Sequence, residues 1–66
     1  MRVTANGDAV ELPAGSSVVD LLEVLGLGAR WVLVERNGVA VARADLASTA
    51  LAEGDRLELV RAVAGG

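Results

Sequence analysis

The sequence predicts an α+β fold in which one helix packs against one face of a mixed sheet of four or five strands. Three observations lead to this prediction. A helical spacing of apolar residues occurs once, at residues 18–25. Short alternating segments precede and follow it, as expected for strands. Two pairs of these segments are joined by Asn-Gly, a dipeptide typical of tight hairpins. The predicted element order is β-β-α-β-β-β.

The first pair of strands is predicted at residues 2–6 and 9–12. Asn6 and Gly7 lie between them, and both residue types tolerate the positive φ angles of a two-residue hairpin turn. Pro13 ends the second strand, because proline lacks the N–H group through which strands pair.

The helix is predicted at residues 18–25, within "GSSVVDLLEVLGLG". Its apolar positions follow the spacing i, i+3, i+4 and i+7, and they are Val18, Leu21, Leu22 and Leu25. Ser17 is a favourable N-cap, and Asp20 three residues later partly imitates a capping box. Gly26 and Gly28 suit the left-handed exit from the helix. We expect packing to hold so short a helix in place.

The second strand pair is predicted in "WVLVERNGVAVA", at residues 31–36 and 39–42, with Trp31 opening the first strand. We interpret Trp31 as a packing or sheet-edge residue rather than a ligand-stacking one. The following "RADLAST" predicts one helical turn.

The last strand is predicted at residues 56–63, after a turn at Gly54 and Asp55 in which Asp55 acts as a turn former. Its alternation predicts two faces, with Leu57 and Leu59 on one and Glu58, Val60 and Ala62 on the other. One helix covers only one face of a sheet, so the other face meets solvent or a partner. The first and last strands are long enough to lie centrally, which indicates a β-grasp arrangement.

Length and composition indicate one folded domain, residues 1–66. The hydrophobic fraction is 53% and the mean hydropathy is +0.50, too apolar for a disordered chain. No stretch reaches the roughly 20 apolar residues of a membrane span, and the N-terminus lacks a secretory pattern. We therefore expect a cytoplasmic protein with no membrane association.

The composition argues against most enzyme classes. The chain contains no Cys and no His, so it lacks a thiol nucleophile, an imidazole base and the usual zinc ligands. Its net charge of −3 and its single aromatic residue, Trp31, argue against a nucleic-acid binder. We expect no catalytic residue and no metal site, and a chain that presents something to an enzyme.

The final segment "VRAVAGG" continues the last strand into two glycines. Glycine is a poor residue for finishing a strand, because it loses much conformational freedom on ordering. Two interpretations stay open from the residues alone: a frayed end, or an end that is itself the functional part.

The chain resembles the ThiS family of ubiquitin-like sulfur carriers over its whole length. The matching segments are the Asn6-Gly7 hairpin, "GSSVVDLL", "VERNGVAVAR", "LAEGDRLELV" and the terminal "AVAGG". Ala42 departs from the family pattern, which often has proline before the arginine, and this change is expected to loosen the turn slightly. Ala64, before the two glycines, stands where the family varies among small residues.

The resemblance implies a chemistry at Gly66. An E1-like adenylyltransferase, ThiF in the thiamine pathway, uses ATP and magnesium to adenylate the C-terminal carboxylate. A sulfur donor, such as a cysteine desulfurase, supplies sulfur for a thiocarboxylate, and the thiazole synthase ThiG receives it. The chain itself is expected to bind no cofactor. Gly65 and Ala64 form with Gly66 a slender flexible tail, residues 64–66, that enters the partner's active site.

A docking patch for the partner is predicted at Val60, Ala62 and Leu33, on the sheet face that the helix leaves uncovered. Isolated exposed apolar residues are the alternative interpretation.

Other functions of the same fold stay open. The small subunit of molybdopterin synthase shares fold and tail but is usually longer, and carriers for other pathways, such as cysteine synthesis, have the same pattern. A protein modifier would use the tail for isopeptide bonds. A plain β-grasp binding module would not depend on Gly66.

Overall fold

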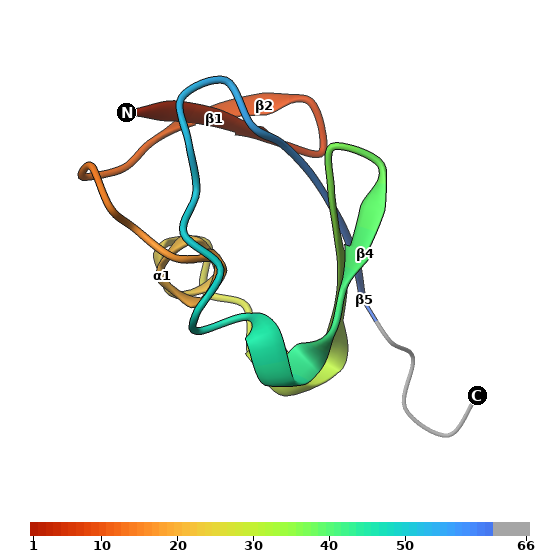
Figure 1. Cartoon of the computed structure of the whole chain (residues 1–66). Helices are drawn as coiled ribbons and strands as arrows, with labels where there is room; N and C mark the ends of the chain where they lie inside the picture. The colour runs from red at the N-terminus through yellow and green to blue at the C-terminus, as the bar shows by residue number, and fades with distance from the viewer. Residues whose placement is uncertain (62–66) are drawn as a thin grey trace.

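The computed structural model describes residues 1–61, in which five strands form one mixed sheet with the order β2-β1-β5-β3-β4. The elements are β1 (Arg2–Ala5), β2 (Asp8–Glu11), α1 (Val18–Val24), the 3-10 turn η1 (Ala29–Trp31), β3 (Val32–Arg36), β4 (Val39–Val41), the 3-10 turn η2 (Arg43–Asp45) and β5 (Arg56–Arg61). The sheet curves around α1, as Figure 1 shows. The predicted α+β class and β-grasp arrangement are confirmed.

Both predicted hairpins are present, and each turns through two residues with positive φ. In the first turn, φ is 50° at Asn6 and 87° at Gly7. In the second, φ is 52° at Asn37 and 85° at Gly38. Asparagine and glycine are the residues that adopt this backbone most readily, so the local sequence accounts for both turns.

The start of α1 is a complete capping box. The Ser17 hydroxyl accepts a hydrogen bond from the Asp20 amide at 3.2 Å, and the Asp20 carboxylate accepts one from the Ser17 amide at 2.8 Å. Of the predicted apolar stripe, Val18, Leu21 and Leu22 are buried. Leu25 is 37% exposed, because α1 ends at Val24 and Leu25 is its C-cap.

Strand β5 lies at the centre of the sheet, parallel to β1 and antiparallel to β3. The side chain of Asn6 extends the pairing of β5 beyond the end of β1. The Asn6 Nδ2 group donates to the Leu59 carbonyl at 3.1 Å, and the Leu59 amide donates to Asn6 Oδ1 at 2.8 Å. The side-chain amide thus takes the place of a peptide group beside β5, a role that the hairpin signal did not predict.

The core lies between α1 and the inner face of the sheet. The loop before β5 closes one side of it, with the Val18 amide donating to the Thr49 carbonyl at 3.1 Å and the Leu51 amide donating to the Ser16 carbonyl at 2.8 Å. The buried hydrophobic residues are Val3, Ala5, Leu12, Val18, Leu21, Leu22, Val32, Val34, Leu46, Leu51, Leu57 and Leu59. The opposite, outer face of the sheet carries the alternate residues of each strand.

The structure differs from the sequence prediction mainly at the start of β3. Trp31 closes the turn η1 and does not open the strand, which begins at Val32. The helical turn predicted after β4 is confirmed as η2. None of the helices in residues 1–61 is long and apolar enough to cross a membrane.

Candidate functional site

The predicted chemistry lies just after β5 in the sequence. Gly66, Gly65 and Ala64, together with Ala62 of the predicted docking patch, lie outside the described residues 1–61. The structure does describe the strand that leads to them, as far as Arg61.

Strand β5 is paired with β3 up to the last described residue. The register runs from Arg36 opposite Leu57 to Val32 opposite Arg61. Because a paired central strand is among the more stable parts of a small domain, the chain is firmly held as far as Arg61, three residues before the predicted tail 64–66.

Two of the predicted docking residues are brought together on the outer face of the sheet. Leu33 of β3 and Val60 of β5 are direct Cα partners. They are 60% and 59% exposed, respectively. We call Leu33 and Val60 the outer apolar pair. Residues directly opposite each other on neighbouring strands have Cβ atoms about 4.5–5.5 Å apart, so the two side chains form one apolar spot.

A second feature of this face is a pair of like charges. Glu35 and Glu58 are direct Cα partners, two residues along each strand from the outer apolar pair. Both are exposed, and neither forms an ion pair with another of residues 1–61. The nearest cation on the face by register is Arg56, two residues before Glu58. We call Glu35 and Glu58 the outer acidic pair.

Sequence reasoning placed Glu58 on the outer face but did not predict that Glu35 lies opposite. The pairing depends on the register between β3 and β5, which are separated in the chain by residues 37–55. The sequence does contain one indication. Glu35 in "LVE" and Glu58 in "ELV" each lie two residues from an outward-facing apolar residue, so alternation places both on the outer face.

Asp55, predicted as a turn former, is a buried hydrogen-bonding centre at the start of β5. Its carboxylate accepts hydrogen bonds from Arg36 Nε at 2.8 Å, from Asn37 Nδ2 at 3.0 Å and from the Ala52 amide at 2.8 Å. It therefore ties the turn before β5 to the β3–β4 hairpin. The prediction covered the local turn alone, because the partners Arg36 and Asn37 are distant in sequence.

The environment of Asp55 shifts its pKa in two opposing directions. Burial acts to raise the pKa of the carboxyl group, while the hydrogen bonds from Ala52, Asn37 and Arg36, together with the positive charge of Arg36, act to lower it. The lowering effects prevail, and the pKa of Asp55 lies below its ordinary value. Asp55 is thus ionised at neutral pH and serves to hold the structure together.

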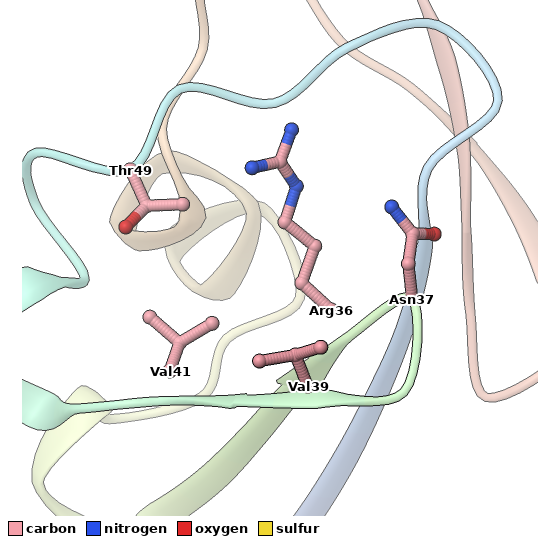
Figure 2. A pocket seen from close by; sticks show the side chains of 5 residues that line it. All are labelled: Arg36, Asn37, Val39, Val41 and Thr49. Atoms are coloured by element: carbon pink, nitrogen blue, oxygen red, sulfur yellow. The ribbon is translucent and has the colours of Figure 1, made fainter.

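A hollow of about 340 Å³ lies on the helix side of the sheet, at its β4 edge. Its lining residues are Arg36, Asn37, Val39, Val41 and Thr49. Figure 2 shows the guanidinium group of Arg36 extending from the hairpin toward the loop that carries Thr49. Arg36 is already paired with Asp55, and the lining offers no acid–base pair. This hollow is separate from the outer face that carries the predicted docking residues.

Within residues 1–61, no group of three or more acidic residues is arranged to hold a metal ion. The most chemically distinctive side chain there is Trp31. It lies half-exposed directly before Val32, the partner of Arg61, and Arg30 sits over its ring at 5.3 Å from the centroid. As the only aromatic residue of the chain, Trp31 gives a fluorescence signal from the region where β5 ends.

Comparison with known families agrees with this geometry. A model of the ThiS family matches residues 2–66, which include every element described above and both terminal glycines. The chain belongs to the ThiS family.

Solved structures agree with the family assignment. The crystal structure of the thiamine biosynthesis protein ThiS from Geobacter metallireducens superposes on this ThiS-family chain with a TM-score of 0.83, at 30% identity and with all of both chains covered.

Two related sequences are longer. A thiazole synthase from Paramagnetospirillum magneticum is 38% identical over 66 residues, and a thiazole synthase from Magnetococcus marinus is 35% identical over the same length. In each case all of this chain is matched, and it spans 20% of the relative's length.

Proposed function

We propose that this ThiS-family chain is a sulfur carrier in the biosynthesis of thiamine. The C-terminal carboxylate of Gly66 is activated, receives sulfur as a thiocarboxylate and delivers it to thiazole synthase. The observation that supports this proposal best is the family match over residues 2–66, because it includes Gly65 and Gly66 together with the scaffold. The chain itself acts as the carrier of the sulfur and as a substrate of its partner enzymes, and not as an enzyme.

The proposed chemistry has two steps. A carboxylate oxygen of Gly66 first attacks the α-phosphorus of ATP, and pyrophosphate leaves. With sulfide as the sulfur source, the sulfur then attacks the carbonyl carbon of the acyl adenylate, and the C–O bond to AMP breaks. One proton is released, and the product is the thiocarboxylate. ATP and magnesium belong to the activating enzyme, and the chain binds neither.

The role of the chain is to present its end. A residue without Cβ passes through a narrow passage and adopts backbone angles that other residues disfavour. Gly65 and Gly66, following Ala64, provide such a slim segment. The paired strand β5 holds the rest of the chain outside the partner's active site. Chemistry of this kind asks for no nucleophile or base from the carrier, in agreement with a sequence that lacks Cys and His.

Three partners follow from the proposal. Thiazole synthase is supported by the relatives of that name, which contain a segment similar to this chain. An E1-like adenylyltransferase carries out the activation. A cysteine desulfurase is the physiological sulfur donor, in which case a thiol must cleave the sulfur–sulfur bond left after transfer. We place all of these reactions in the cytoplasm.

The test is a reconstitution with the purified chain, the E1-like enzyme of the same organism, Mg-ATP and sulfide. Intact-mass spectrometry should show one oxygen replaced by sulfur. Oxidation of Met1 or Trp31 adds nearly the same mass, so fragmentation must locate the change at Gly66. The proposal predicts that the change requires ATP and is confined to Gly66.

The matched control is the chain shortened by Gly66 alone. We expect it to keep the circular dichroism spectrum and melting temperature of the full chain and to form no thiocarboxylate. A chain that never acquires sulfur under these conditions, or acquires it equally without Gly66, contradicts the proposal. Conjugation of Gly66 to lysine side chains of other proteins, without thiocarboxylate, would indicate a protein modifier.

A further inference from the structure

The asparagines of the two Asn-Gly turns are also bonded to β5 or to the residue before it. The Asn37 amide donates to the Arg56 carbonyl at 2.8 Å, and the Arg56 amide donates to Asn37 Oδ1 at 2.9 Å. The Asn37 Nδ2 group donates to Asp55 Oδ1 at 3.0 Å. Asn6 makes three corresponding hydrogen bonds to β5 from the first hairpin. The two asparagines thus attach β5 to the hairpins on both sides of it.

We propose that Asn37 is a site of spontaneous deamidation, and that the reaction weakens the attachment of the start of β5 to the second hairpin. The inference goes beyond the proposed function and does not depend on it. Asparagine is a chemically labile residue, and a following glycine leaves the backbone nitrogen that attacks it unhindered, because glycine has no side chain. The sequence contains this dipeptide twice, at Asn6-Gly7 and Asn37-Gly38, and the surroundings of the two differ.

The reaction takes up one water molecule and releases one ammonia molecule. The backbone nitrogen of Gly38 bonds to Cγ of Asn37, the bond from Cγ to Nδ2 breaks, and the Gly38 N–H proton leaves with the amine as ammonia. Water then opens the cyclic succinimide. Attack of water at Cγ gives aspartate, and attack at the main-chain carbonyl carbon gives isoaspartate, whose peptide link runs through the side chain. Either product gains a carboxyl group, which loses its proton at neutral pH.

Two features of the structure favour reaction at Asn37 over reaction at Asn6. Asn37 lines the hollow of about 340 Å³, and Figure 2 shows its side chain rising from the end of the hairpin beside Arg36, so it has room to turn toward the Gly38 nitrogen. Its hairpin also ends in the shorter edge strand, since β4 has three residues and β2 has four. A shorter edge strand separates from its sheet more readily, and separation releases the side chain from its hydrogen bonds.

The product places a carboxylate against a buried charge. An anionic oxygen takes the place of the Asn37 Nδ2 group, which lies 3.0 Å from Asp55 Oδ1. Asp55 is 6% exposed, and within residues 1–61 Arg36 is its one ion-pair partner. Two carboxylates that share one arginine repel each other in a poorly hydrated site. The hydrogen bond from residue 37 to Asp55 is therefore lost, and a repulsion replaces it at the start of β5.

The first experiment incubates the full-length chain at neutral pH, in buffer and in parallel in guanidinium chloride. Trypsin cuts after arginine and releases the two turns in separate peptides, residues 3–30 and 37–43. Chromatography with mass spectrometry then separates the asparagine, aspartate and isoaspartate forms, and an unincubated sample gives the background of the digestion. We expect similar rates at both sites in the unfolded chain, and reaction about fivefold faster at Asn37 than at Asn6 in the folded chain.

The second experiment measures the consequence with Asn37→Asp, which carries the aspartate product from the start. We expect its melting temperature to lie roughly 5–10 °C below that of the unchanged chain. The double variant Asn37→Asp/Asp55→Asn exchanges the amide and the carboxylate and restores a donor between them. It should therefore melt higher than the sum of the two single losses predicts.

The matched control is Asn6→Asp, at a turn with nearly the same φ, 50° against 52°. The bonding partners of the Asn6 side chain are the main-chain groups of Leu59 and not a carboxylate. Combination of Asn6→Asp with Asp55→Asn is therefore expected to give additive losses, without the rescue seen for residue 37.

The outcomes decide both parts of the inference and leave Gly66 untouched, so their failure does not bear on the proposed function. Reaction at Asn6 as fast as at Asn37 in the folded chain, or at neither while the unfolded chain is converted, overturns the site. Additive losses in Asn37→Asp/Asp55→Asn overturn the consequence. If Asn37→Asp does not fold, the incubated chain replaces it: its converted fraction should unfold at lower guanidinium chloride than its unconverted fraction, and equal midpoints contradict the weakening.

Discussion

Asp55 shows how much one side chain contributes to holding β5 in place. Its carboxylate receives three hydrogen bonds, from the turn before β5 and from the second hairpin. Hydrogen bonds to a charged group contribute about 1.5–3 kcal/mol each, more than those between neutral groups. Loss of this carboxylate charge therefore weakens the attachment of the start of β5 to the second hairpin.

We predict that Asp55→Asn lowers the free energy of unfolding by about 2 kcal/mol at neutral pH. The folded pKa of Asp55 lies below its unfolded value, so its ionisation stabilises the fold above the unfolded pKa of about 3.9. That contribution is lost as the pH falls through the folded pKa. The difference between the two proteins in urea unfolding should be largest near pH 7 and should shrink in acid.

The control is Asp45→Asn, which neutralises an exposed carboxylate on η2 whose side chain makes no hydrogen bond among the described residues. We expect it to change stability by less than about 0.5 kcal/mol. A deficit of Asp55→Asn that is the same at pH 7 and in strong acid would show that the ionised carboxylate is not the source of the stability.

The turn between β4 and η2 has a backbone that suits proline. Ala42 has φ −64° and ψ 145°, the φ that a proline ring imposes. Its N–H donates no backbone hydrogen bond within residues 1–61, and the preceding Val41 is in a strand, as proline requires. Ala42→Pro is therefore expected to stabilise the fold by about 0.4–1 kcal/mol, by restricting the unfolded chain.

Thermal unfolding checks this prediction, with Ala42→Gly as the matched counterpart. Glycine widens the unfolded ensemble, so it should lower the melting temperature where proline raises it, and alanine should lie between them. A proline variant that melts below the unchanged chain would show that residue 42 needs a different backbone or uses its N–H group.

The elements that the sequence predicted correctly are those whose cause is local. The two Asn-Gly turns need positive φ at adjacent positions, and the start of α1 needs Ser17 and Asp20 three residues apart. The turn η1 was missed, because "ARW" has no capping or turn residue, and its Trp31 favours a strand by propensity. The end of α1 was predicted one residue too late, because Leu25 continues the apolar spacing of the helix.

Contacts between residues distant in sequence could not be predicted from the pattern of any single segment. The clamp of Asn6 on Leu59 joins residues 53 positions apart. The contacts of Asp55 and the opposition of Glu35 to Glu58 also depend on strand register. The outward direction of Leu33 and Val60 was predictable from alternation alone. The role of Gly66 came from the family resemblance, and the described residues leave it a prediction.

In the whole molecule, β5 is a central strand, paired with β1 on one side and with β3 on the other. The inner face of the sheet is used for stability, through the residues packed on α1. The outer face carries both the outer apolar pair and the outer acidic pair, and their side chains are exposed. The two faces of the sheet therefore differ in role, because only the inner face contributes to the core.

The most direct test of the carrier function follows the sulfur atom. Gly66 is first converted to a thiocarboxylate with heavy-isotope sulfide, and the excess sulfide is removed. The loaded chain is then mixed with thiazole synthase and the other substrates of that enzyme. If the chain carries the sulfur, the thiazole product contains the heavy isotope and the chain returns to its carboxylate mass. A product with unlabelled sulfur, formed while the thiocarboxylate on Gly66 stays intact, would contradict it.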